Sequence, residues 1–140
     1  MKLPVTPCGL KGLSMTEAHV FDPHVFDVWY VRFRFEDNPT QFVERPALVI
    51  QECDGNVYAL MLRITKNVSR RAPYDVVLDD WREAGLRMPS AVRCDKIMKV
   101  GASDVVWSKP RFGALSEHDA ERVIEMLAVM SGDGVQWNPV

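Results

Sequence analysis

The sequence lacks the short motifs that mark most recognisable catalytic and metal-binding sites. It has no glycine-rich phosphate-binding loop, no nucleophile elbow, no histidine-rich metal motif and no internal repeat. Its three cysteines are an odd number and lie too far apart for a Cys-x-x-Cys pair, so they indicate neither a zinc site nor a disulfide framework. We therefore expect a protein of the reducing cytoplasm that works without a cofactor or a metal.

Long apolar runs are also missing. Pro4, Pro7 and Gly9 interrupt the N-terminal residues, and no later stretch is long enough to span a bilayer. We expect neither secretion nor a membrane partner.

What is present is typical of one globular domain. The chain has 140 residues, of which 47% are hydrophobic and 26% charged. A formal net charge of −2 argues against a protein that coats nucleic acid. The charge is uneven, however, because residues 27–112 hold 14 Lys or Arg against 12 Asp or Glu, whereas residues 113–140 hold one Arg against five acids. The sequence thus leaves room for a local basic patch.

The most informative stretch is residues 45–66, which predicts a β-hairpin. An apolar run over 46–50 precedes Asp54-Gly55-Asn56, a strong hairpin turn signal, and a second apolar run covers 57–64. Antiparallel pairing then sets Arg45 opposite residue 64, 65 or 66, and the middle register pairs it with Thr65.

That middle register sorts the hairpin side chains onto two faces. One face is a continuous apolar surface made by Pro46, Leu48, Ile50, Leu60, Leu62 and Ile64. The other, less apolar face carries Arg45, Ala47, Gln51, Arg63 and Thr65. A cation and a hydroxyl therefore meet at the open end of the hairpin, where a solvated rim is the common explanation and an anion site the rarer one.

The remaining pattern predicts a mostly β protein. Alternating side chains indicate strands over 26–35, 74–78, 91–100 and 105–109, and the periodicity and caps of residues 116–132 predict one α-helix. Short strands, tight turns and one C-terminal helix favour a small, partly open antiparallel barrel with the helix packed over one end. We expect residues 1–24 to be an N-terminal extension, 25–131 the folded domain and 132–140 a tail.

Few positions could carry chemistry. Besides Arg45 and Thr65, they are Arg93 and Asp95, which a period of two puts on one face of a strand. Such a pair is more often a surface ion pair of little energetic value. Beside a phosphodiester, however, Asp95 could take a proton from a ribose 2′-hydroxyl, and Arg93 or Arg45 could stabilise charge on the phosphate oxygens.

Four segments carry a resemblance to a known family. Residues 44–50 (ERPALVI), 64–65 (IT), 89–95 (PSAVRCD) and 112–116 (FGALS) resemble, in order and spacing, the PemK/MazF family of bacterial toxins. The resemblance covers about residues 25 to 130, and the run Val92-Arg93-Cys94-Asp95 looks most like the PemK/Kid branch.

The resemblance implies an SH3-like barrel of the CcdB/MazF type that forms homodimers and cleaves single-stranded RNA at short sequences. In the family this needs no metal and proceeds by attack of the 2′-hydroxyl to leave a cyclic phosphate. The implied catalytic residues are Arg45, Thr65, Arg93 and Asp95. Further RNA contacts are expected at Gln41, Glu44, Arg63, Lys66, Arg70, Arg71 and Ser90.

Three functions stay open. The leading hypothesis is a sequence-specific endoribonuclease, an mRNA interferase toxin of a toxin–antitoxin pair. The second is a CcdB-like toxin that binds a protein target such as a gyrase, which would not need an Arg93–Asp95 pair. The third is a catalytically idle family member, because Lys66 follows Thr65 where the family usually has serine.

Two protein partners are expected. Val49 and Met61 add apolar groups to the less apolar face of the hairpin, which predicts that a second copy covers it in a homodimer. A cognate antitoxin is expected to block the arginine-lined groove with an acidic segment that is disordered before binding.

Overall fold

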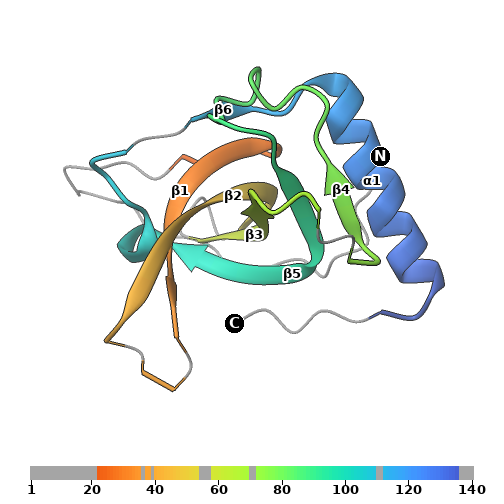
Figure 1. Cartoon of the computed structure of the whole chain (residues 1–140). Coiled ribbons are helices and arrows are strands. Elements are labelled where there is room, and N and C mark those ends of the chain that lie inside the picture. The colour runs from red at the N-terminus through yellow and green to blue at the C-terminus, as the bar shows by residue number, and fades with distance from the viewer. Residues whose placement is uncertain are drawn as a thin grey trace.

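The computed structural model describes residues 22–35, 37–38, 40–53, 58–69, 72–109 and 112–135. This part of the chain forms six strands and one C-terminal α-helix, whose arrangement can be followed in Figure 1. The elements are β1 (Asp27–Arg34), β2 (Phe42–Cys53), β3 (Tyr58–Thr65), β4 (Asp75–Val77), β5 (Ala91–Gly101), the 3-10 turn η2 (Ala102–Asp104), β6 (Gly113–Ala114) and α1 (Glu117–Gly132). The prediction of a mostly β protein with a C-terminal helix is confirmed.

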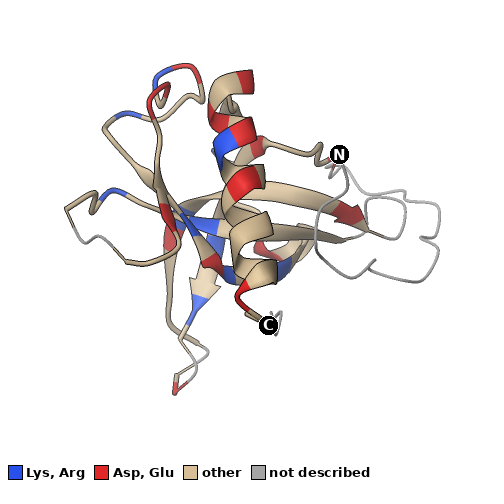
Figure 2. Ribbon diagram, turned by 90° about the vertical axis from the view of Figure 1, so that its right-hand side faces the viewer, with Lys and Arg blue, Asp and Glu red and all other residues tan. Residues whose placement is uncertain are grey.

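The six strands form one antiparallel sheet in the order β4-β5-β3-β2-β1-β6. The sheet curls into a half-barrel, and α1 lies along its β4 and β5 side (Figure 1). Figure 2 shows that α1 carries mostly acidic charges, as the uneven charge distribution predicted, with basic residues on the strands beside it.

The hairpin register is confirmed at its open end. Ala47 pairs with Arg63 and Leu48 with Leu62, and the same register continued outward sets Arg45 level with Thr65. Further along, a bulge after Val49 shifts the pairing by one residue. The turn residues 54–57 lie outside the described residues.

Both faces of the sheet are buried over part of their area. On the helix side, the predicted apolar face of the hairpin packs with α1 in a core that includes Leu48, Ile50, Leu62, Ile64 and Val123. On the opposite side a second core forms from Trp29, Val31, Ala47, Val49, Ala59, Met61, Val100 and Val105. The curl of the sheet and the segment after β5 therefore shield a face that the sequence predicted to be less apolar.

This second core corrects the argument for a homodimer. Val49 and Met61 are both 0% exposed within a single chain, so they offer no apolar surface to a partner. The argument failed because strand alternation shows which residues share a face but not what covers that face. Homodimer formation itself stays a prediction.

The strand predicted over 105–109 is wrong. Val105 forms only an isolated bridge with Val31, and Trp107 packs edge-on against Trp29, with ring centroids 6.2 Å apart. The sixth strand is instead β6, which pairs with Asp27 and Val28 of β1. A strand of two residues is too short to show periodicity, so sequence alternation could not identify it.

Helix α1 begins and ends as predicted. The Ser116 side chain caps it by accepting a hydrogen bond from the Asp119 backbone N–H at 3.2 Å, and Gly132 is its last residue. Ala120, Val123, Leu127 and Met130 are buried against the sheet. No helix in the described part of the chain is long and apolar enough to cross a membrane.

The cysteine prediction is wrong at one position. Cys53, at the end of β2, is disulfide-bonded. Cys94 is buried in the core beneath α1, and its burial raises the pKa of the thiol to about 12. A thiol with so high a pKa carries no thiolate at neutral pH, which agrees with a packing role for Cys94.

Candidate active site

A row of directly paired residues, apolar at one end and charged at the other, crosses the sheet face opposite the helix. Ala47 pairs with Arg63, Arg63 with Arg93, and Arg93 with Asp75, so the row runs through β2, β3, β5 and β4. Residues directly opposite one another on neighbouring strands point to the same face. Since Ala47 belongs to the second core, this face is apolar at one end and charged at the other.

The charged end contains a buried ion pair. Arg93 Nε lies 3.6 Å from Asp75 Oδ1, and the two side chains are only 9% and 6% exposed. Neither of these two atoms makes a hydrogen bond among the described residues. A buried ion pair offsets the cost of desolvation only when its remaining hydrogen bonds are satisfied. The Arg93–Asp75 pair is therefore poorly explained as a stabilising contact.

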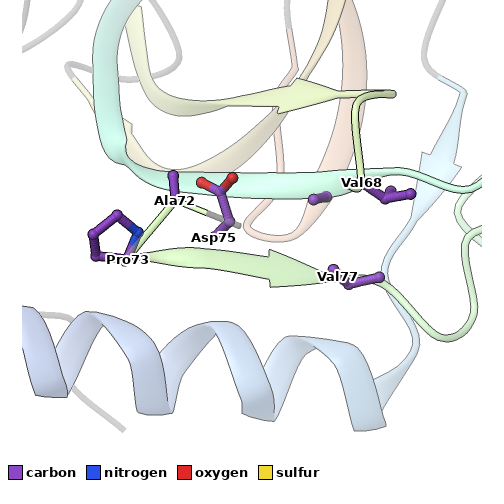
Figure 3. A pocket seen from close by; sticks show the side chains of 6 residues that line it. Val68, Ala72, Pro73, Asp75 and Val77 are labelled. Atoms are coloured by element: carbon purple, nitrogen blue, oxygen red, sulfur yellow. The ribbon is translucent and has the colours of Figure 1, made fainter. Parts of the chain in front are cut away.

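A hollow of about 480 Å³ adjoins this pair. Its lining comes from β4, the start of β5 and the segment between β3 and β4, and consists of Val68, Ala72, Pro73, Asp75, Val77 and Ala91. Figure 3 shows the Asp75 side chain on the side of β4 that faces away from α1, with Pro73 and Val77 at the two ends of this strand. We call the cavity the β4–β5 hollow. Among the described residues that line the hollow, Asp75 is the only one with a charged side chain, and the others are apolar.

Asp95 stands apart from the Arg93–Asp75 pair. Leu62 pairs with Ile97, but the next residue of β3, Arg63, pairs with Arg93, so residues 94–96 of β5 form an irregular insertion. The period-two argument that linked Arg93 to Asp95 does not hold across this insertion, and the ion-pair partner of Arg93 is Asp75. Asp95 Oδ1 is buried and makes no hydrogen bond to the described residues.

The surroundings of Tyr74 indicate where Asp95 lies. Its hydrogen bond to Asp133, together with its partial desolvation, raises the pKa of Tyr74, and the charge of Asp95 adds to this increase. Asp95 thus lies near the Tyr74 end of the short strand β4, whereas Asp75 lies one residue further along that strand.

Arg45 and Thr65 share the open end of the hairpin but do not bond to each other. The Arg45 side chain is exposed and donates from Nη1 to the carbonyl oxygen of Glu44 at 2.8 Å. Thr65 Oγ1 accepts a hydrogen bond from the Asn67 backbone N–H at 3.1 Å. The cation of Arg45 and the hydroxyl of Thr65 therefore lie at the same end of the hairpin, as predicted, but each is hydrogen-bonded to a different partner.

The other predicted RNA contacts are in different settings. Arg63 lies over the Phe33 ring, with 5.1 Å from its guanidinium carbon to the ring centroid, while Gln41 and Lys66 are exposed. Glu44 Oε1 lies 3.6 Å from Lys109 Nζ. Ser90 is only 4% exposed, and its hydroxyl donates to the Met88 carbonyl. Arg70 and Arg71 lie outside the described residues.

Sequence reasoning missed Asp75. Its alternation with the buried Val76 would have placed it on the face opposite the helix. The pairing of β4 with β5, which brings Asp75 against Arg93, has no local signal in a strand of three residues.

A second cluster of charges lies at the start of α1, which we call the helix-cap cluster (Asp79, Asp80, Ser116, His118, Asp119 and Arg122). Asp119 is 0% exposed and accepts hydrogen bonds from the backbone N–H groups of Asp79 and Asp80, at 3.1 and 2.8 Å, and from Arg122 at 3.1 Å. His118 Nε2 lies 2.8 Å from Asp79 Oδ2. This contact raises the pKa of His118 and lowers that of Asp79.

The helix-cap cluster has the spacing of a metal site but the chemistry of an ion-pair network. Ligand atoms of Asp79, His118 and Asp119 all lie within 4.8 Å of one another. Arg122 Nη1, however, lies 3.1 Å from Asp119 and 3.4 Å from Asp79, where a metal ion would have to replace it. The carboxylates already have a cation, so this cluster does not indicate a metal.

The structure is a small curled β-sheet with a C-terminal helix and with arginines on the sheet face opposite that helix. These features are those of a small β-sheet toxin. The chain belongs to the PemK-like, MazF-like toxin family of type II toxin–antitoxin systems, whose family model matches residues 24–131. The resemblance noted in the sequence is thus confirmed at the level of the family, while the PemK/Kid branch stays a prediction. No curated protein matches the chain.

Solved structures share the fold. An endoribonuclease from a mycobacterial species, in complex with its cognate antitoxin, is 15% identical with a TM-score of 0.59, over 84% of this chain and 100% of that chain. The Mycobacterium tuberculosis toxin MazF-mt6 is 19% identical with a TM-score of 0.57, over 79% and 99%. A chain of a MazE–MazF crystal structure from Deinococcus radiodurans is 16% identical with a TM-score of 0.59, over 79% of this chain and 96% of that chain.

Proposed function

We propose that this toxin is a sequence-specific endoribonuclease that cleaves single-stranded RNA without a metal ion. The observation that carries the proposal is the buried Arg93–Asp75 pair, whose unmet hydrogen bonds lie beside the β4–β5 hollow. A similar fold belongs to a mycobacterial protein described as an endoribonuclease, which supports the same activity here.

The residues present suit cleavage by the ribose 2′-hydroxyl. That oxygen attacks the adjacent phosphorus, the bond to the 5′-oxygen breaks, and a cyclic phosphate and a free 5′-hydroxyl result. The reaction needs a base near the 2′-hydroxyl, a proton for the leaving 5′-oxygen and positive charge near the phosphate oxygens. Arginine donors supply such charge in a fixed planar geometry, so no metal is required.

We assign these roles to the predicted catalytic residues. Arg93 lies within the sheet and acts as the acid that protonates the leaving 5′-oxygen or as the cation that stabilises the phosphate oxygens. Arg45, which is exposed at the open end of the β2–β3 hairpin, binds the phosphate from solvent. Asp95 serves as the base, because it is the carboxylate of the family-like run and Arg93 does not already neutralise it. Thr65 then hydrogen-bonds the phosphate beside Arg45.

The remaining contacts extend this site along the RNA. Arg63 and Lys66 lie on or next to β3 and are placed to contact flanking phosphates. Arg32 and Arg34 both lie over the ring of Phe42, which is 42% exposed, and such a basic and aromatic surface suits unpaired bases. Gln41 and Glu44, which are also predicted to contact RNA, lie just before and within β2, beside Phe42 in the β1–β2 hairpin.

The decisive experiment is to incubate the purified protein with a mixed RNA and map the new 5′ ends. We expect cuts at a short recurring sequence, 5′-hydroxyl products and equal cleavage with and without EDTA. Loss of cleavage on chelation would contradict the metal-free mechanism. Intact RNA in every condition would favour the idle or protein-binding alternatives.

We also propose a cognate antitoxin and a homodimer. A similar mycobacterial toxin was solved with its antitoxin, and an acidic segment would complement Arg45, Arg63 and Arg93. Phe35 and Phe42, which are 44% and 42% exposed, lie at the turn end of the β1–β2 hairpin, where a second copy could cover them. Light scattering should give twice the monomer mass. Co-expression of the adjacent open reading frame should restore growth, and binding of its product to the toxin should weaken as the salt concentration rises.

A further inference from the structure

The β4–β5 hollow combines apolar side chains with one carboxylate among its described lining residues, and this combination favours a particular kind of ligand. Its apolar side chains provide contact surface, and its volume of about 480 Å³ falls within the range of small-molecule sites. Asp75 is the one charged residue in the described part of this lining, and its side chain is more than nine-tenths buried. An apolar hollow with a single buried carboxylate suits a flat, mostly apolar ligand that offers an N–H donor.

The two oxygens of Asp75 have different surroundings. Oδ1 is buried and lies 3.6 Å from Arg93 Nε. Oδ2 has no hydrogen-bond partner among the described residues and, unlike Oδ1, is not enclosed. One oxygen is therefore held towards the proposed phosphate-binding arginine, while the other is left for a ligand in the hollow.

We propose that Asp75 is a specificity-determining residue that makes the β4–β5 hollow select an RNA base with an exocyclic amino group and reject uracil. This inference rests on the proposed ribonuclease function. A carboxylate accepts hydrogen bonds and donates none. It pairs with the amino group of cytosine, adenine or guanine, whereas it faces repulsion from the two carbonyl oxygens that flank the only ring N–H of uracil.

The location of Asp75 links base choice to cleavage. Arg93 contacts Asp75 and also belongs to the set of residues assigned to the phosphate. A base held in the hollow would therefore place its own or the adjacent phosphate near Arg93. The wrong base would cover Asp75 Oδ2 without offering it a hydrogen bond, and a polar group that is buried without a partner is a strong source of discrimination.

The first test uses the wild-type protein on a randomised RNA library. We expect one position next to the cut to exclude uracil. Replacing the base there with its analogue lacking the amino group should reduce cleavage by about 5- to 100-fold. Cleavage that tolerates uracil at every position near the cut would overturn the inference while leaving the ribonuclease function intact, and no cleavage of any RNA would overturn both.

The second test uses Asp75→Asn, with Asp79→Asn as the matched control. The amide keeps the shape of the carboxylate but adds a donor, so the variant should gain cleavage at sites with uracil and lose its preference for amino-bearing bases. Asp79 lies in the helix-cap cluster, so Asp79→Asn should keep the wild-type preference. An unaltered preference in Asp75→Asn would show that Asp75 only positions Arg93.

A binding measurement keeps the inference testable if the variant fails to fold. Fluorescence anisotropy with wild-type protein and oligonucleotides carrying a 2′-deoxyribose at the cut position separates recognition from cleavage. The amino-bearing oligonucleotide should bind about 5- to 100-fold more tightly than its analogue without the amino group. Equal affinities for the two would overturn the inference.

Discussion

Two regions of this toxin combine buried carboxylates with arginine, yet they differ in how completely their hydrogen bonds are satisfied. In the helix-cap cluster, Asp119 accepts from two backbone N–H groups and from Arg122. In the Arg93–Asp75 pair, the facing atoms lie 3.6 Å apart and make no hydrogen bond among the described residues. The first arrangement joins the start of α1 to the turn after β4, whereas the second leaves donors and acceptors for a ligand.

The difference shows how a structural network can be told from a site. A satisfied buried carboxylate repays its desolvation within the fold. An unsatisfied one costs stability, and proteins keep such costs chiefly where function requires them. The same residue types therefore stabilise the fold in one region and form a proposed ligand site in the other. Substitutions should distinguish these two roles.

The largest expected effect comes from replacing the pair itself. Arg93→Met combined with Asp75→Leu removes both buried charges, so stability should stay equal or rise, because apolar replacements often match or exceed a buried ion pair. Cleavage should fall by roughly 10²-fold or more, since the phosphate loses its buried cation. Chemical denaturation and cleavage rates on one RNA measure the two effects. A variant that is folded and fully active would mean that the pair takes no part in the reaction.

A comparable loss of rate is expected when the base is removed. Asp95→Asn keeps the side-chain shape but cannot accept the 2′-hydroxyl proton, so the cleavage rate should fall by about 10²- to 10⁴-fold. Glu125→Gln, which changes an exposed carboxylate on α1, serves as the control and should retain the wild-type rate. Rapid cleavage by Asp95→Asn would remove Asp95 from the mechanism.

The helix-cap cluster should respond in stability rather than in activity. Asp119→Ala leaves two backbone donors and Arg122 without their acceptor, which we expect to cost about 2–4 kcal/mol of unfolding free energy. Urea denaturation measures the loss. At a temperature where the variant remains folded, its cleavage rate should match the wild type, and a selective loss of cleavage would contradict the division between the two regions.

The smallest effect concerns pH. The contact with Asp79 raises the pKa of His118 above its ordinary value of 6.5, so its stabilising effect is complete below that pH and is lost as pH rises through the folded pKa. Asp79, whose pKa is lowered from 3.8, stabilises above that value and ceases to do so as pH falls through its folded pKa. Stabilisation should therefore be greatest between about pH 4 and 6.5.

Thermal unfolding of wild type and His118→Gln across this pH range tests the contact. The difference in melting temperature between the two proteins should be largest at mildly acidic pH and shrink towards alkaline pH. A constant difference would show that the imidazole contributes by packing rather than by charge.

Local sequence patterns predicted most of the fold. Alternation located β1, β2, β3 and β5 to within a few residues, and the capping serine Ser116 and Gly132 bounded α1. The hairpin register at the open end was also predictable, since a one-residue slip would expose the apolar face of β2 and β3. The runs that resembled the toxin family lie within the region matched by the family model.

The candidate site was predictable only in part. Arg93 was identified because it lies in a family-like run, and the structure brings it to the charged end of the sheet face. Its partner was predicted to be Asp95, but the insertion at 94–96 breaks the period of two on which that prediction depended. A bulge of this kind depends on the pairing of β5 with β3 and leaves no mark in the alternation of β5 alone.

The sequence by itself determined the strands, the helix and the family, because each follows from local periodicity, capping or a contiguous motif. Only the tertiary structure decided that Val49 and Met61 are buried within one chain, and that Asp75 rather than Asp95 contacts Arg93. Both outcomes depend on which segments meet across the curled sheet. That choice is made by the packing of whole faces, for which a strand of three residues such as β4 carries almost no local signal.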